Sequence, residues 1–284
     1  MRLIFSLCAA LAVLTTTAAF AEDSLPPTGR APIEARLVEF QAFDGSTERY
    51  FEWTPEKFDP AKSTTLIIAL HGHGSDAGQI FSGVYAEYNA TLDLAAERNA
   101  IVVSPDYRAT TSWMGPAAEK DVLQIIAKAK AERRIDRVFF VGGSMGGSSA
   151  LTFAALHPEL VDGVVAMNPT ANHIEYENFQ DAIAASFGGS KKDVPLEYKN
   201  RSAEYFPERF LKIPTAITLG GIDVIVPPES ARRLAKAINA LGGNVLCIER
   251  PELGHTTQYP DARAALEFVF DGARQKTKEA SSAL

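Results

Sequence analysis

One serine lies among glycines in the run G-G-S-M-G at residues 142–146. The apolar residues 138–141 precede this run, and the helix-like residues 148–156 follow it. The pattern G-x-S-x-G between a strand and a helix is typical of a nucleophile elbow. Such a turn is so sharp that larger flanking side chains would collide with the backbone, and it holds the serine in a strained conformation. We therefore expect Ser144 to be a nucleophile.

A serine hydroxyl is a weak nucleophile, and it needs a histidine base that a carboxylate orients. Asp223 follows the apolar residues 215–219 in a glycine-rich turn. It is the preferred acid, because ligands bind at the carboxyl ends of parallel strands. Glu229 is the weaker alternative, since acidic residues are common in the first turn of any helix.

His255 is the predicted base. It follows the apolar residues 244–249 and stands directly behind Gly254, which frees the loop. With Ser144 and Asp223 it gives the order serine, acid, histidine along the chain, which is one of the known orders of a catalytic triad.

Backbone amides are expected to hold the negative charge that develops on the substrate oxygen. The Met145 N–H is one predicted donor, because it directly follows the nucleophile and begins a helix. The second is expected from the loop H-G-H-G after residues 65–70. We choose the His73 N–H, with Gly72 and Gly74 as alternatives.

The same loop offers a rival interpretation, because His71, His73 and Asp76 resemble half of a binuclear metal site. A metal site needs three or four ligands, and the five histidines of the chain leave few partners. We predict no metal and no cofactor.

Polar and aromatic side chains follow two other predicted strands. Tyr107 and Trp113 come after residues 100–104, and His173 comes after residues 163–167. We name these three as candidate substrate-binding residues, with loop packing as the alternative.

The remaining pattern predicts an α/β fold with a mostly parallel, doubly wound sheet, an antiparallel N-terminal hairpin and helices on both faces. Short apolar runs alternate with helical stretches, as expected for strands buried on both faces. The hairpin is expected over 36–43 and 49–53. The later strands are expected at 65–70, 100–104, 138–141, 163–167, 215–219 and 244–249, and the helices at 80–98, 116–131, 146–156, 175–186, 228–241 and 261–275.

The chain of 284 residues is expected to hold one catalytic domain, residues 36–284, after a leader at 22–35. The connection at 168–211 is longer than a crossover needs, and it is a candidate for a small cap over the site. A surface excursion without a substrate role is the alternative.

Residues 1–21 are predicted to be a secretory signal peptide, with Arg2, an apolar stretch and the cleavage motif A-F-A at 19–21. The apolar stretch is too short for a membrane span, so we expect a periplasmic or extracellular protein with no span after cleavage; a retained anchor is the alternative. The net charge of −7 disfavours nucleic acid and anionic membrane as partners. After cleavage Cys247 is the one cysteine left, and its apolar neighbours predict a buried strand residue.

At these motifs the chain resembles the serine hydrolases of the α/β-hydrolase superfamily. The likeness is to the branch of dienelactone-hydrolase-like and depolymerase-like esterases and prolyl-oligopeptidase catalytic domains, and it covers about residues 35–275. The motifs that carry it are H-G-H-G at 71–74, G-G-S-M-G at 142–146, G-I-D at 221–223 and G-H at 254–255. The resemblance implies that Ser144, Asp223 and His255 act as nucleophile, acid and base. The chain departs from these relatives in two ways: we expect no propeller before the core, and the expected nucleophile is serine rather than the cysteine of dienelactone hydrolases. The resemblance therefore leaves the substrate open.

We therefore predict an esterase that forms an acyl-enzyme and acts on a small-molecule or saccharide-linked ester. Two alternatives stand beside it: a peptidase with the same triad, because triad geometry does not separate esters from amides, and a silent binding protein on the same scaffold. The sequence leaves the oligomeric state open.

Overall fold

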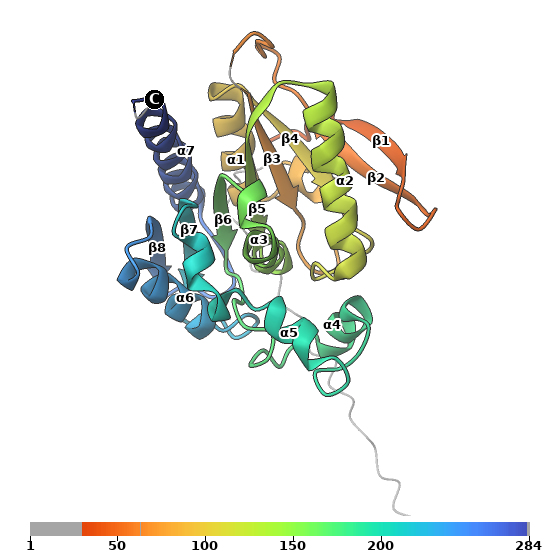
Figure 1. Ribbon diagram of the computed structural model, residues 1–284, viewed down its shortest axis with the longest axis vertical. Helices are drawn as coiled ribbons and strands as arrows, with labels where there is room; N and C mark the ends of the chain where they lie inside the picture. The colour runs from red at the N-terminus through yellow and green to blue at the C-terminus, as the bar shows by residue number, and fades with distance from the viewer. Residues whose placement is uncertain (1–29, 63, 283–284) are drawn as a thin grey trace, which may run out of the picture.

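The computed structural model describes residues 30–62 and 64–282. Its centre is one eight-stranded sheet, in which the first two strands are antiparallel and the rest run parallel (Figure 1). This is the predicted architecture. In order across the sheet, the strands are β1 (Arg36–Gln41), β2 (Thr47–Trp53), β4 (Ala100–Pro105), β3 (Thr64–Leu70), β5 (Ile135–Gly143), β6 (Gly163–Met167), β7 (Thr215–Gly220) and β8 (Val245–Arg250).

The central strands are buried along their whole length, which explains their continuous apolar sequences. Every residue of β3, β4, β6 and β7 is buried. The outer strands β1 and β8 have partly exposed residues throughout, because each has a neighbour on one side. The sheet order brings the carboxyl ends of β5, β6, β7 and β8 together at one edge.

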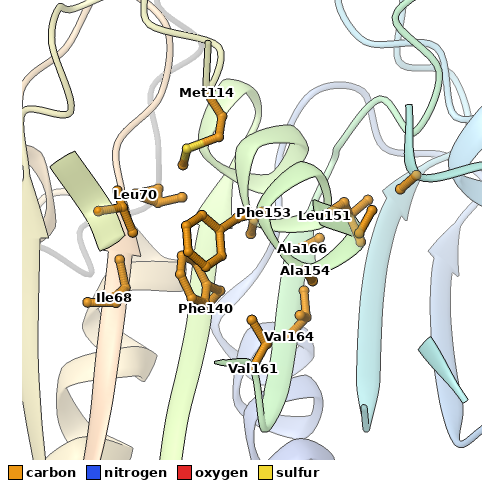
Figure 2. Packing of buried hydrophobic residues seen from close by; sticks show 14 of the residues in the cluster. Ile68, Leu70, Met114, Phe140, Leu151, Phe153, Ala154, Val161, Val164 and Ala166 are labelled. Atoms are coloured by element: carbon orange, nitrogen blue, oxygen red, sulfur yellow. The ribbon is translucent and has the colours of Figure 1, made fainter. Parts of the chain in front are cut away.

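Helices cover both faces of this sheet. The core on one face receives side chains from α2, α3, α4 and α6, and the core on the other face receives them from α1 and α7. On the first face, Phe140 and Phe153 stack with ring centroids 4.4 Å apart, beside Leu70 and Met114 (Figure 2). The helices are α1 (Ala86–Glu97), α2 (Pro116–Glu132), α3 (Met145–Leu156), α4 (Gln180–Phe187), α5 (Pro195–Asn200), α6 (Glu229–Ala240) and α7 (Tyr259–Ser282).

The predicted helix at 80–98 is wrong at its start. The chain first makes a short 3-10 turn, η1 (Ala77–Phe81), and α1 begins only at Ala86. Gly83 separates the two with φ of +76°, and a Cβ atom there would lie 2.1 Å from the carbonyl oxygen of Arg30. The chain therefore turns at this glycine, where a helix cannot continue.

The prediction for Cys247 is also wrong, because this residue is exposed. It belongs to β8, whose burial pattern is intermediate or exposed at every position. An apolar run indicates burial on both faces only in the interior of a sheet, and β8 is an edge strand.

Residues 168–211 form a layer at the carboxyl edge of the sheet. It contains α4, α5 and the 3-10 turns η3 (Ala203–Tyr205) and η4 (Pro207–Phe210), and in Figure 1 α4 and α5 lie together at the lower end of the molecule. Its helix is shorter than predicted, because α4 starts at Gln180 rather than Glu175. Arg201 fastens the layer to α2, since it donates to Met114 O at 2.7 Å and pairs with Glu119 at 2.7 Å.

The predicted signal peptide lies outside the described residues. No helix within residues 30–62 and 64–282 is long and apolar enough to cross a membrane.

Candidate active site

Ser144 lies at the sharp turn between β5 and α3. Its φ of 57° and ψ of −121° are strained for a residue with a side chain. Its N–H donates to Met167 O at 2.7 Å, and its carbonyl accepts from Ser148 N at 2.9 Å, so the backbone is held on both sides. This is the geometry of a nucleophile elbow.

The two glycines of the pattern are required by contact. A Cβ atom on Gly142 would lie 2.4 Å from Gly146 C, and a Cβ atom on Gly146 would lie 2.1 Å from Leu70 O. Both distances are far below any tolerable contact. Gly143 has more room, and its N–H donates to the Tyr88 hydroxyl at 3.1 Å, which in turn donates to Leu70 O at 3.0 Å.

Asp223 and His255 meet at the ends of β7 and β8. His255 Nδ1 lies 2.6 Å from Asp223 Oδ2, and Asp223 Oδ1 accepts from the N–H groups of Ile225 and Val226, each at 2.9 Å. Asp223 is 5 % exposed, and both of its carboxylate oxygens take part in hydrogen bonds. It therefore fixes the imidazole with Nδ1 as the donor and leaves Nε2 free to act as a base.

Asn168 connects the loops that carry these groups. Its side chain accepts from Gly220 N at 3.0 Å and donates to Thr257 Oγ1 at 3.1 Å, and Thr257 also bonds Thr218 at 2.7 Å. This network joins the ends of β6 and β7 to the histidine loop. Sequence reasoning did not single out Thr257, because a buried threonine gives no signal in a loop.

Ser144 Oγ makes no hydrogen bond to His255 among the described residues. Catalytic hydrogen bonds are often long in structures without substrate. The Ser144–His255 contact therefore stays a prediction, whereas the Asp223–His255 contact is present.

The loop after β3 offers one free amide of its three candidates. Gly72 N donates to Gln79 Oε1 at 2.7 Å, and Gly74 N donates to Thr110 O at 2.7 Å. In the part of the chain that the structure describes, the His73 N–H has no acceptor. This pattern favours His73 over the two glycines, as the sequence-based choice did.

Two of the candidate substrate-binding residues, Tyr107 and Trp113, form hydrogen bonds with the loop after β3. Tyr107 donates its hydroxyl to His71 O at 2.7 Å, and Trp113 donates Nε1 to His73 Nδ1 at 3.2 Å. Burial lowers the pKa of His73, which agrees with an unprotonated Nδ1 that accepts this bond. Tyr107, Trp113 and His173 are all 1 % exposed or less. Because these side chains are covered by neighbouring residues, they would affect a bound substrate through those neighbours rather than by direct contact.

A hollow of about 470 Å³ opens beside this loop. The exposed ring of Phe179 forms one wall and lies 4.2 Å from the His73 ring, centroid to centroid. Phe179 has φ of 55°, which a non-glycine residue adopts at a cost. The lining residues are His73, Glu177, Phe179, Gln180, Asp181 and Ala182.

The other chemical candidates of the sequence lie elsewhere. Glu229 begins α6, where its carboxylate faces Arg232 at 3.8 Å and is largely exposed, whereas Asp223 holds the histidine. Within the described residues no three histidine, cysteine, aspartate or glutamate side chains form a cluster that would bind a metal ion. The His71 ring lies in the core and bonds Gly72 O and Asp106 O.

Comparison with solved structures defines the class of fold. An acylaminoacyl peptidase from Pyrococcus horikoshii superposes with a TM-score of 0.64 at 14 % identity, over 84 % of this chain and 40 % of that chain. An S-formylglutathione hydrolase from Agrobacterium tumefaciens superposes with a TM-score of 0.63 at 16 % identity, over 86 % of this chain and 99 % of that chain. The fold is that of the α/β-hydrolase superfamily of serine hydrolases.

Sequence comparison narrows the class to a family. Residues 86–270 match the prolyl oligopeptidase family, and the chain belongs to that family. The uncharacterized esterase Atu5261 of Agrobacterium fabrum is 29 % identical over 92 residues, which is 32 % of this chain and 15 % of that protein. The chain spans less than half of the length of the curated relatives it matches.

Proposed function

We propose that this protein hydrolyses carboxylic esters with Ser144 as the nucleophile, His255 as the base and Asp223 as the orienting acid. The observation that carries the proposal is the 2.6 Å bond between His255 Nδ1 and buried Asp223, together with a strained serine elbow at the carboxyl end of β5 in the same sheet. As the predicted signal peptide indicates, the reaction would take place in the periplasm or outside the cell.

The first half-reaction forms an acyl-enzyme. Ser144 Oγ bonds to the ester carbonyl carbon while His255 Nε2 takes the hydroxyl proton, and the N–H groups of Met145 and His73 donate to the oxyanion. The carbon–oxygen bond to the alcohol then breaks, and His255 returns the proton to the leaving oxygen. Each oxyanion donor of this kind typically contributes about 2.7–4 kcal/mol to lowering the barrier.

The second half-reaction uses water in place of the alcohol. His255 takes a proton from the water as its oxygen bonds to the acyl carbon, and the acid product leaves as the proton returns to Ser144 Oγ. Throughout, Asp223 accepts the hydrogen bond from His255 Nδ1 and stabilises the imidazolium that forms beside it. We assign part of the substrate, a small-molecule or saccharide-linked group, to the hollow beside Phe179, because His73 is one of the residues that line it.

Peptide hydrolysis is the second candidate, and membership of the prolyl oligopeptidase family favours it. The triad alone does not distinguish the two. Short p-nitrophenyl esters of graded acyl length and dipeptide or prolyl p-nitroanilides, assayed on the same preparation, separate them. A higher kcat/KM for the amides would replace the esterase proposal with the peptidase.

Ser144→Ala tests the nucleophile directly. We expect it to abolish labelling by a fluorophosphonate probe and to lower p-nitrophenyl acetate turnover by about 10⁶, the loss known for such a serine. Ser148→Ala is the matched control, because Ser148 lies one helical turn further on and bonds the Ser144 carbonyl. Labelling that persists in Ser144→Ala and disappears in the control would contradict the assignment.

A further inference from the structure

A second carboxyl group, that of Glu87, lies beside the serine elbow. Glu87 lies in the first turn of α1, the helix that follows β3, so its end of the helix faces the carboxyl edge of the sheet. Its Oε1 lies 3.7 Å from where a Cβ atom of Gly143 would stand, next to the residue that precedes Ser144.

The neighbouring residue fixes this position. Tyr88 is 2 % exposed, and its hydroxyl joins Gly143 N to Leu70 O. The hydrogen bonds of Tyr88 therefore join the elbow to the first turn of α1. Because Glu87 precedes Tyr88 in that turn, its half-buried carboxyl lies beside the elbow.

His255 is the charged residue that acts on the Glu87 carboxyl, since its positive charge lowers the Glu87 pKa. The imidazole comes from the loop before α7, and α7 packs along α1 on the same face of the sheet. Tyr88 is the titratable neighbour on its own helix. The other ion pairs between these helices, Glu97 with Arg263 and Arg98 with Asp271, lie at the far end of α1.

We propose that Glu87 is a positioning residue of the catalytic centre, whose carboxylate acts on His255 from the elbow side while Asp223 acts on Nδ1. The inference rests on the proposed function. Ionised Glu87 stabilises the imidazolium that forms when Ser144 attacks, so it lowers the barrier by the same physics as Asp223 but without direct contact with Nδ1.

Two side chains line the Gly143 side of the elbow. A Cβ atom on Gly143 would lie 3.4 Å from the Tyr88 hydroxyl oxygen and 3.7 Å from Glu87 Oε1. Burial raises the pKa of Glu87 to about 7, and the positive charge of His255 opposes that rise, so the charges of the two side chains act on each other.

Glu87→Gln keeps the shape and removes the charge. Without a nearby negative charge, the imidazole loses its proton more readily. We expect the acid limb of the kcat/KM profile to move down by about half to one pH unit, and the plateau to fall by about three- to tenfold. Glu87→Asp, which keeps the charge, is expected to restore part of both. A merely structural role for Glu87 would lower the plateau and leave the limb in place.

Glu97→Gln is the matched control, because it makes the same change in the last turn of the same helix. We expect it to keep the wild-type limb. An acid limb in Glu87→Gln that stays in place, or moves to higher pH, overturns the inference.

An NMR titration of the His255 ring separates this inference from the proposed function. The signal is assigned by its absence in His255→Asn, and its midpoint is expected to fall in Glu87→Gln by the same half to one unit, roughly. An inactive protein with a shifted His255 midpoint would refute the esterase proposal alone. An active protein with an unshifted midpoint would refute the role of Glu87 alone.

Discussion

The side chains of the candidate triad differ in how firmly the backbone holds them. Asp223 accepts two backbone hydrogen bonds and the bond from His255, whereas Ser144 is fixed by its backbone and leaves Oγ unpaired among the described residues. The acid and base are thus pre-organised before substrate arrives. We expect the bond between Ser144 Oγ and His255 to form when substrate is bound.

Asp223→Asn tests this pre-organisation. The new amide oxygen can still accept from Ile225 and Val226, so the loop keeps its shape. Its NH₂ group then faces His255 Nδ1 and favours the wrong tautomer, for which we expect kcat to fall by about 10⁴. Turnover of p-nitrophenyl acetate measures the loss, and thermal unfolding shows whether the fold is kept. Asp271→Asn on α7 is the control; a comparable loss there would mean that the effect is not local.

At the scale of elements, the loops that carry the acid and the base pack closely, backbone against backbone, at Gly220 and Gly254. A Cβ atom on Gly220, at the end of β7, would lie 1.9 Å from the carbonyl oxygen of Gly254, in the loop after β8. A Cβ atom on Gly254 itself would meet nothing within 4 Å. Both residues are loop glycines in the sequence, but only Gly220 lies where a side chain would collide with the backbone.

Gly220→Ala is expected to push the two loops apart. Overpacking of this kind costs about 1–3 kcal/mol, which lowers the melting temperature by roughly 2–4 °C for each kcal/mol. We also expect kcat/KM to fall, because the shift of the two loops separates Asp223 from His255. Gly254→Ala should leave both close to wild type. Calorimetry and kcat/KM on the two variants decide the point, and equal behaviour would contradict the contact.

The strands and the elbow were predictable because they depend on local pattern. Residues 163–167 were predicted as a strand and form β6. The start of the helix expected at 80–98 could not be predicted in this way. The obstacle at Gly83 is the carbonyl oxygen of Arg30, which is distant in the sequence, and no local pattern reveals it. The exposure of Cys247 likewise depends on β8 being last in the sheet. At the site, Ser144 and His255 stand in recognisable motifs, whereas Glu87 is an ordinary first-turn acid until the fold places it beside Gly143.

At the scale of the whole molecule, His173 joins the layer of residues 168–211 to the sheet domain. It is 1 % exposed, its N–H donates to Ser202 at 2.8 Å, and its ring packs edge-on to Trp113 and Phe187. Its Nε2 lies 3.3 Å from Thr152 Oγ1 on α3. The layer is thus held by a ring that must stay neutral to remain buried.

This burial makes the stability of the protein depend on pH. Burial, and then the nearby Arg201 and Lys191, lower the pKa of His173 to about 3, against about 6.5 in an unfolded chain. A lowered pKa in the folded state means that the stabilisation is complete above pH 6.5 and is lost as the pH falls from there towards 3. Glu87 acts in the opposite sense, because its raised pKa favours the folded state as the pH falls below 7.

His173→Gln removes the titrating ring from this layer. We expect the free energy of unfolding in urea to decrease less steeply with falling pH in the variant, by up to about 1.4 kcal/mol for each pH unit between 6.5 and 4.5. The comparison is of slopes, so a lower stability of the variant at pH 7.5 does not affect it. Parallel curves for the two proteins over this range would show that His173 is protonated in the folded state, and the neutral ring would then not be what holds the layer to the sheet.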